Sequence, residues 1–217
     1  MVLMAIAGPS YKFLFVDIGS EGKASDGGIW NKSTFYDALH DPANPPKIPP
    51  PCIIPGISDP VPYFVLADDA FALRPNLLKP YPSLGLTKKQ RLFNYRLSRS
   101  RRVIENVFGI LTCRFRIYRK TIECNPDFVS EIVMATCILH NFLREKAQQD
   151  YTPPGSLDEE DDDGNVVPGT WRDEVPLPSL PRDKRKNASE YAKNLRNSLA
   201  DYFNTKCGSV PWQYNII

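Results

Sequence analysis

The sequence predicts a mixed α/β protein, because strand-type segments fill its first part and helix-type segments its second. Two short β-rich runs, residues 2–7 and 11–18, open the chain around a Gly-Pro-Ser turn. A third apolar run, residues 62–67, leads directly into two aspartates. Amphipathic helical patterns follow in residues 87–111 and 128–145. At 217 residues, with 42% hydrophobic side chains, the chain has room for one domain and appendages.

The stretch between the second and third predicted strands is rich in glycine and then in proline. Residues 19–28 form a glycine-rich loop, and a short helix is predicted from the N-cap Ser33 to about Leu39. Nine of the 21 residues from Pro42 to Pro62 are proline, which excludes helix and central strand. An extended surface loop is therefore predicted here.

The first long helix starts at a capping box, in which Thr87 is the N-cap and Gln90 lies three residues on. We expect it to reach about Leu111, with a bend near residues 98–100. At 100° per residue its apolar positions form one stripe, and Glu105 lies at the border of that stripe. The apolar residues of the stripe are Leu97, Ile104, Val107, Phe108 and Leu111.

The second half of the chain predicts two more helices around an acidic segment. Residues 128–145 are apolar enough for a core helix, and residues 188–204 predict a last helix. Between them, residues 151–180 hold six consecutive carboxylates and many prolines and glycines, which predicts disorder. The expected organisation is a domain at 1–146, a disordered acidic and proline-rich linker at 147–187, and a C-terminal helix and tail at 188–217.

Charge is strongly segregated along the chain, although the total is only +2. Residues 87–120 carry 11 basic side chains and a single acidic one, Glu105. A local net charge of +10 is typical of a polyanion partner. The five cysteines include no C-x-x-C pair, and no apolar run approaches the roughly 20 residues of a membrane span. A zinc site and a membrane segment are therefore not predicted.

Asp68 and Glu105 are the candidate site residues. Two carboxylates on rigid elements beside a basic face can hold a divalent metal against a phosphodiester. The alternatives are ordinary ones: Glu105 can pair with Arg101 or Arg102 at helical spacing, and Asp68 can cap a turn. Spacing alone leaves both interpretations open.

A series of motifs occurs in order across roughly residues 1–145. They are Val16-Asp-Ile-Gly, Ser25-Asp-Gly-Gly, Leu66-Ala-Asp-Asp-Ala-Phe, Phe93-Asn-Tyr-Arg-Leu-Ser, Arg101-Arg-Val-Ile-Glu-Asn-Val-Phe-Gly-Ile-Leu and Ile138-Leu-His-Asn-Phe-Leu. Together they resemble the DDE domain of PIF/Harbinger transposases and the nucleases derived from them. The closing Val210-Pro-Trp-Gln is similar to animal members of that family.

This resemblance implies an RNase H-like fold, in which helices flank a mixed sheet. It places the family's second catalytic aspartate at Asp68 and its catalytic glutamate at Glu105, as ligands of Mg²⁺ or Mn²⁺. Asp26 is expected to support these ligands by hydrogen bonding, with a loop Asx turn as the alternative. DNA contacts are expected from four arginines of the basic helix, namely Arg96, Arg99, Arg101 and Arg102.

The chain departs from the family pattern at its start. The family's first catalytic aspartate lies on the opening strand of the fold, whereas residues 2–7 match the second strand. We therefore expect the first strand to be missing and the metal site to lack one ligand. Little or no strand cleavage is expected from this polypeptide alone.

Three function classes follow from these observations. The first is a divalent-metal-dependent DNA endonuclease of transposase origin, acting in the nucleus or in both nucleus and cytoplasm. The second is a catalytically inactive remnant that binds DNA or protein. The third is a fragment that does not fold without its missing strand. DNA is the expected partner, a separate DNA-binding protein is a further one, and no membrane is expected.

Overall fold

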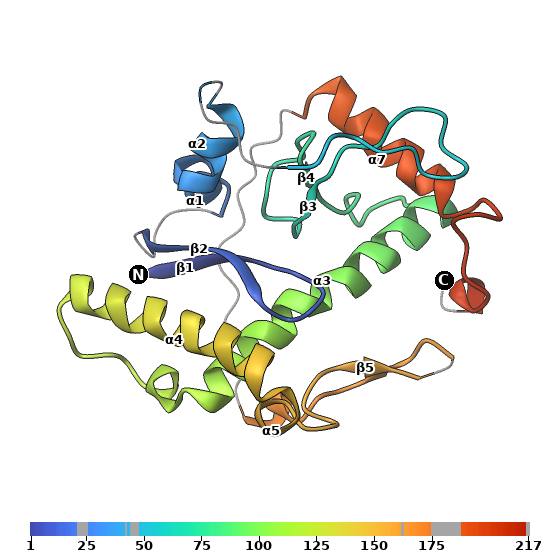
Figure 1. Cartoon of the computed structure of the whole chain (residues 1–217). Coiled ribbons are helices and arrows are strands. Elements are labelled where there is room, and N and C mark those ends of the chain that lie inside the picture. Colours follow the sequence, from blue (N-terminus) through green and yellow to red (C-terminus); the bar gives the residue numbers. More distant parts are fainter. Residues whose placement is uncertain (21–25, 42, 44–47, 162, 175–187, 216–217) are drawn as a thin grey trace. The chain divides into compact units, whose positions relative to one another are not determined.

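The structure is a computed structural model, and it describes residues 1–20, 26–41, 43, 48–161, 163–174 and 188–215. The chain divides into two compact units. Figure 1 labels helices and strands of the chain. The first comprises Met1–Ala24 and Arg102–Leu180, and the second comprises Ser25–Arg101 and Pro181–Ile217. Helix α3 (Lys88–Arg114) contributes residues to both. In the part of the chain that is described, no helix is long and apolar enough to cross a bilayer.

An antiparallel hairpin opens the first unit. Strand β1 (Val2–Ala7) pairs with β2 (Phe13–Ser20), and Ala5 lies opposite Val16. The turn is closed by hydrogen bonds from Gly8 N to Lys12 O and from Tyr11 N to Gly8 O. Both predicted strands are confirmed, although the second begins two residues later than expected.

Helix α4 (Pro126–Lys146) is joined to this hairpin by two polar side chains. The Asn141 side chain accepts a hydrogen bond from Phe13 N and donates one to Phe13 O, both at 2.8 Å. The buried His140 ring lies 2.8 Å from Tyr11 O and 2.9 Å from the Tyr151 hydroxyl. His140 is therefore a satisfied core histidine that fixes the helix to the hairpin turn.

The core of the first unit lies between β2, α3 and α4. It is built on five buried residues, namely Phe13, Val107, Leu111, Val133 and Cys137. Val107 and Leu111 belong to the predicted apolar stripe of the basic helix. The prediction of a core helix at 128–145 is correct for only one face of α4, because Phe128, Ile138 and Phe142 on it are more than half exposed.

The acidic segment is folded where the structure describes it, contrary to the predicted disorder of residues 151–180. Helix α5 (Gln148–Tyr151) precedes a hairpin of β5 (Glu159–Glu160) and β6 (Val166–Val167), and α6 (Trp171–Glu174) follows. Its composition favoured disorder, but the buried rings of Tyr151 and Trp171 anchor the segment. Residues 175–187 lie outside the described residues, so the linker boundaries remain predictions.

Helices dominate the second unit. They are α1 (Asp26–Lys32), α2 (Thr34–His40), α7 (Glu190–Tyr202) and the first half of α3. Helix α1 occupies part of the predicted glycine-rich loop. Ser33 caps α2 by accepting from Tyr36 N, as predicted. The capping box of α3 is also confirmed: Gln90 N donates to Thr87 Oγ1, and Thr87 N donates to Gln90 Oε1. The helix continues through the predicted bend as one element.

The predicted strand at 62–67 is short in the structure. Only β3 (Val65–Leu66) forms, and it pairs in parallel with β4 (Leu77–Leu78), which was not predicted. Proline-rich sequence on its N-terminal side limits the ladder, because proline has no amide hydrogen to donate. Across the described residues the strands form three separate two-stranded sheets. The single mixed sheet expected from the sequence is therefore not observed there.

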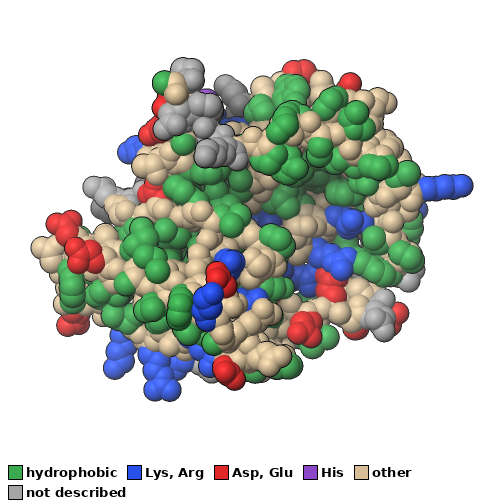
Figure 2. All heavy atoms as spheres, viewed as in Figure 1, with side chains coloured by type: hydrophobic (Ala, Val, Ile, Leu, Met, Phe, Trp, Pro, Cys, Tyr) green, Lys and Arg blue, Asp and Glu red, His purple; other side chains and the backbone are tan. Residues whose placement is uncertain are grey.

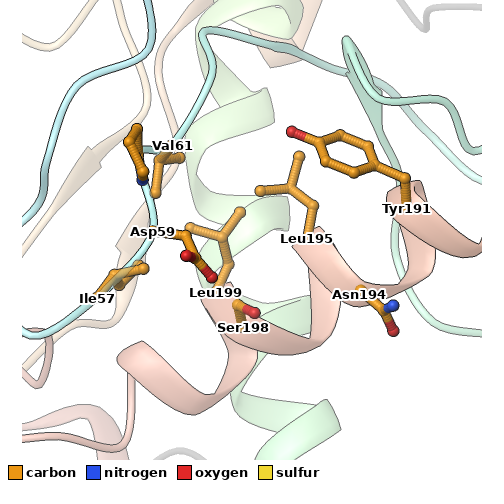
Figure 3. A pocket seen from close by; sticks show the side chains of 9 residues that line it. Ile57, Asp59, Val61, Tyr191, Asn194, Leu195, Ser198 and Leu199 are labelled. Carbon is orange, nitrogen blue, oxygen red and sulfur yellow. The ribbon is translucent and has the colours of Figure 1, made fainter.

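The core of the second unit lies between α3, α7 and the β3–β4 pair, with Leu78, Phe93 and Leu199 among its buried residues. A pocket of about 200 Å³ opens between α7 and residues 57–61 (Figure 3). Leu195 and Leu199 face Val61 across it in this view. Asp68 is not among the residues that line the pocket.

Candidate metal-binding carboxylates

Asp68 follows β3 and begins a tightly bonded loop in the second unit. The strand ladder extends to the residue before it, because Ala67 N donates to Leu78 O at 2.8 Å. Asp68 Oδ1 accepts from Ala70 N at 2.9 Å, which is the turn that sequence reasoning kept as an alternative. Its Oδ2 lies 3.8 Å from Arg101 Nη2, and the side chain is 42% exposed. One carboxylate oxygen therefore shapes the loop and the other faces a cation at the surface.

Lys79 holds this loop from within. The residue is buried, and its Nζ donates to the carbonyl oxygens of Asp69 and Phe71, both at 2.6 Å. The Asp69 carboxylate lies 3.8 Å from the same nitrogen. Sequence reasoning missed Lys79. The signal was a lone lysine directly after the buried pair Leu77–Leu78, where a charged side chain needs several acceptors.

Glu105 lies in the part of α3 that belongs to the first unit. Its Oε2 accepts a hydrogen bond from Arg172 Nη2 at 3.3 Å, and its side chain is 38% exposed. The alternative of a pair at helical spacing is not observed among the described residues: Arg101 pairs with Asp68, and Arg102 pairs with Glu160. Sequence reasoning missed Arg172 because it lies in the segment predicted to be disordered.

Asp68 belongs to the second compact unit and Glu105 to the first. The contacts given above for each carboxylate are contacts within its own unit. Asp26 is the first residue of α1, but the structure does not describe its side chain. The prediction that Asp26 supports the metal ligands therefore stays a prediction. Within the described ranges, no group of three or more His, Cys, Asp or Glu side chains is arranged to hold a metal ion. The donor types still fit Mg²⁺ or Mn²⁺, which prefer carboxylate oxygens.

The four arginines expected to bind DNA have partners within the chain. Arg96 donates to Gln213 Oε1 at 3.1 Å and lies over the Phe203 ring, and burial lowers its pKa. The Arg99 guanidinium lies 4.1 Å from the centre of the Trp212 ring. Arg101 and Arg102 each form an ion pair with a carboxylate. Figure 2 shows that Lys and Arg side chains and Asp and Glu side chains both occur on the face that it displays. The DNA contacts of the four arginines remain a prediction.

Carboxylates are the usual ligands of the metal ions in phosphodiester-cleaving enzymes, and Asp68 and Glu105 are both partly exposed carboxylates. The chain belongs to the DDE superfamily endonuclease family, whose model matches residues 1–141. The resemblance seen in the sequence motifs is thereby confirmed. No solved structure matches the chain significantly.

Two kinds of named relative support the family assignment. The chain is 31% identical over 101 residues to the putative nuclease HARBI1 of Mus musculus, covering 44% of this chain and 29% of that protein. It is 27% identical over 155 residues to the ALP1-like protein of Arabidopsis thaliana, covering 69% of this chain and 36% of that protein. The chain therefore spans about a third of the length of these relatives.

Proposed function

We propose that this chain is a transposase-derived nuclease domain that acts on DNA in the nucleus with a divalent metal, Mg²⁺ or Mn²⁺. The observation that carries the proposal is the family match over residues 1–141, within which Asp68 and Glu105 both lie. The similarity to a relative named a putative nuclease supports the same reaction class.

In this proposal Asp68 and Glu105 hold the metal through carboxylate oxygens. The chemistry that a bound metal supplies in such enzymes is stabilisation of phosphodiester charge and activation of water. Arginines of α3 contact phosphates and position the nucleic acid. A site that rests on two carboxylates binds a metal weakly, so we expect cleavage by this chain to be impaired.

Metal binding tests the proposal directly. Mn²⁺ binding to the purified chain is measured by the loss of the free-ion paramagnetic resonance signal, for the wild type and for Asp68→Asn and Glu105→Gln. We expect each substitution to weaken binding at least about 10-fold, because each removes one charged ligand. Asp127→Asn, which changes an exposed carboxylate at the start of α4, is the matched control. Equal binding by all four proteins would contradict the proposed site.

A second candidate function is an inactive remnant that binds DNA or protein without chemistry. It is favoured by the ion pairs themselves, because Asp68 and Glu105 each face an arginine rather than only other carboxylates. DNA binding measured by fluorescence anisotropy separates the two functions. Affinity that is the same with Mn²⁺ and with chelator, together with no nicking of supercoiled plasmid, supports the remnant.

A further inference from the structure

The folded acidic segment lies against one face of α3 within the first unit. We call residues 156–161 and 163–173 the docking segment. On the helix it contacts Arg102, Glu105, Asn106, Gly109 and Cys113. Arg102, Asn106, Gly109 and Cys113 follow one another at intervals of three or four residues, and Glu105 lies beside Asn106, so the contacts share one side of the helix. The candidate ligand Glu105 therefore lies inside an intramolecular interface.

Asn106 is the centre of this interface. It is almost fully buried, and its Oδ1 accepts from Asp158 N at 2.9 Å and from Trp171 Nε1 at 2.8 Å. The absence of a side chain at Gly109 allows the Trp171 ring to approach the helix backbone. These contacts set where Asp158 and Trp171 lie relative to Glu105.

Asp158 in turn fixes the direction of the Arg172 side chain. Its carboxylate is fully buried and accepts from Gly169 N at 2.9 Å and from Arg172 Nε at 2.8 Å. Arg172 Nη2 donates to the second oxygen of Asp158, which completes a bidentate pair. Such a pair restricts the planar guanidinium to one orientation.

The same Nη2 atom donates to Glu105 Oε2 at 3.3 Å. Both side chains are partly exposed, so the contact adds little to folding stability. A fixed donor still restricts the orientation of the carboxylate that it contacts. In metalloproteins the partners of ligating carboxylates act in this way, and losing one typically costs 10–100-fold in metal affinity or activity.

We infer that Arg172 is a positioning residue for Glu105: held by Asp158, it binds one Glu105 oxygen and orients the other toward a divalent metal. This inference rests on the proposed metal site. The opposite role is that the guanidinium competes with the metal for Glu105. The two roles predict opposite changes in metal affinity when Arg172 is replaced. Removing a competitor strengthens metal binding, whereas removing a positioning group weakens it.

The experiment measures Mn²⁺ affinity of the full chain by paramagnetic resonance at constant ionic strength, for the wild type, Arg172→Ala, Arg172→Lys and Glu105→Gln. Arg116→Ala is the charge-matched control, because Arg116 is an exposed cation of the same unit and lies in a different helical element, the 3-10 helix Arg116–Arg119. We expect about 10-fold or greater weakening in Arg172→Ala and a smaller loss in Arg172→Lys. Added guanidinium at a non-denaturing concentration should restore binding to Arg172→Ala, and equal sodium chloride should not.

Each outcome decides between the inference and the function on which it rests. If Glu105→Gln loses Mn²⁺ and Arg172→Ala binds as tightly as the wild type or tighter, the positioning role is wrong and the metal site stands. If Glu105→Gln binds like the wild type, or if the wild type does not bind Mn²⁺, the metal site and the positioning role both fail. Thermal unfolding checks each variant, and Arg172→Lys decides the question if Arg172→Ala does not fold.

Discussion

Replacing Gly109 with alanine should detach the docking segment from α3. A Cβ atom built at Gly109 would lie 2.2 Å from Trp171 Cδ2 and 2.4 Å from its Cε3. These contacts are far inside van der Waals distance, and the ring belongs to a side chain that is almost fully buried. Either the helix or the tryptophan must move, and we expect the tryptophan to move because it lies on the four-residue helix α6 and not on the long helix α3.

Two opposing effects set the size of the change. Alanine in place of glycine favours a helix interior by about 0.5–1 kcal/mol. A buried tryptophan covers roughly 150–250 Å² of surface, which at about 25 cal/mol per Å² is ~4–6 kcal/mol if the ring becomes fully exposed. The loss exceeds the gain even if only half of that surface is exposed. We therefore expect a net destabilisation of about 1–5 kcal/mol.

The assay combines urea unfolding with hydrogen exchange over residues 156–173. We expect Gly109→Ala to lower the unfolding midpoint and to lose amide protection in that segment. Ser98→Ala is the control, because Ser98 is exposed on the same helix and tests the propensity effect without a clash. A Gly109→Ala chain that is as stable as Ser98→Ala, with protection of the docking segment unchanged, would refute the close approach of Trp171 to the helix.

Three further substitutions test other contacts. Lys79→Met removes the lysine donor from two partly buried carbonyl oxygens, so urea melts should show a loss of about 2–4 kcal/mol. Ser33→Ala removes the cap of α2 and should cost about 1 kcal/mol in the same assay. Burial lowers the pKa of His140 below 6.5 in the folded chain. As the pH falls, the imidazole is therefore protonated at a higher pH in the unfolded chain than in the folded one. Stability should therefore decline as pH falls below about 6.5, and His140→Gln should flatten that decline in melts across pH 5–8.

The features that sequence reasoning predicted correctly depend on short-range rules. The Ser33 cap, the Thr87–Gln90 capping box and strand β1 are each specified within a few neighbouring residues. The buried stripe through Val107 and Leu111 follows from helical period alone. In each case the local signal and the tertiary environment agree, so no information from distant parts of the chain was needed.

The features that were missed depend on contacts between distant residues. Strand β4 is only two residues long, and its pairing with β3 cannot be inferred from period. The acidic segment has a composition typical of disorder, yet the interface of Trp171 with Asn106 and Gly109 anchors it on α3. The partner of Glu105 was missed for the same reason, because Arg172 reaches α3 only when that segment is folded.

The charge of the basic region gives an upper limit for DNA contacts once its ion pairs are known. Eleven cations lie in residues 87–120, and within the described ranges three of them form ion pairs with carboxylates: Lys89 with Asp201, Arg101 with Asp68 and Arg102 with Glu160. If DNA is contacted through this region alone and these pairs persist in the complex, at most the other eight cations of the region neutralise phosphates. The logarithm of DNA affinity should then fall with the logarithm of salt concentration with a slope no steeper than about −7. Anisotropy titrations from low to physiological salt measure this slope. A slope near −10 that falls to about −7 in a Lys184→Ala, Arg185→Ala, Lys186→Ala variant would assign the extra contacts to cations outside this region. A slope that stays near −10 in that variant would indicate that intrachain pairs such as Arg102 with Glu160 open on binding.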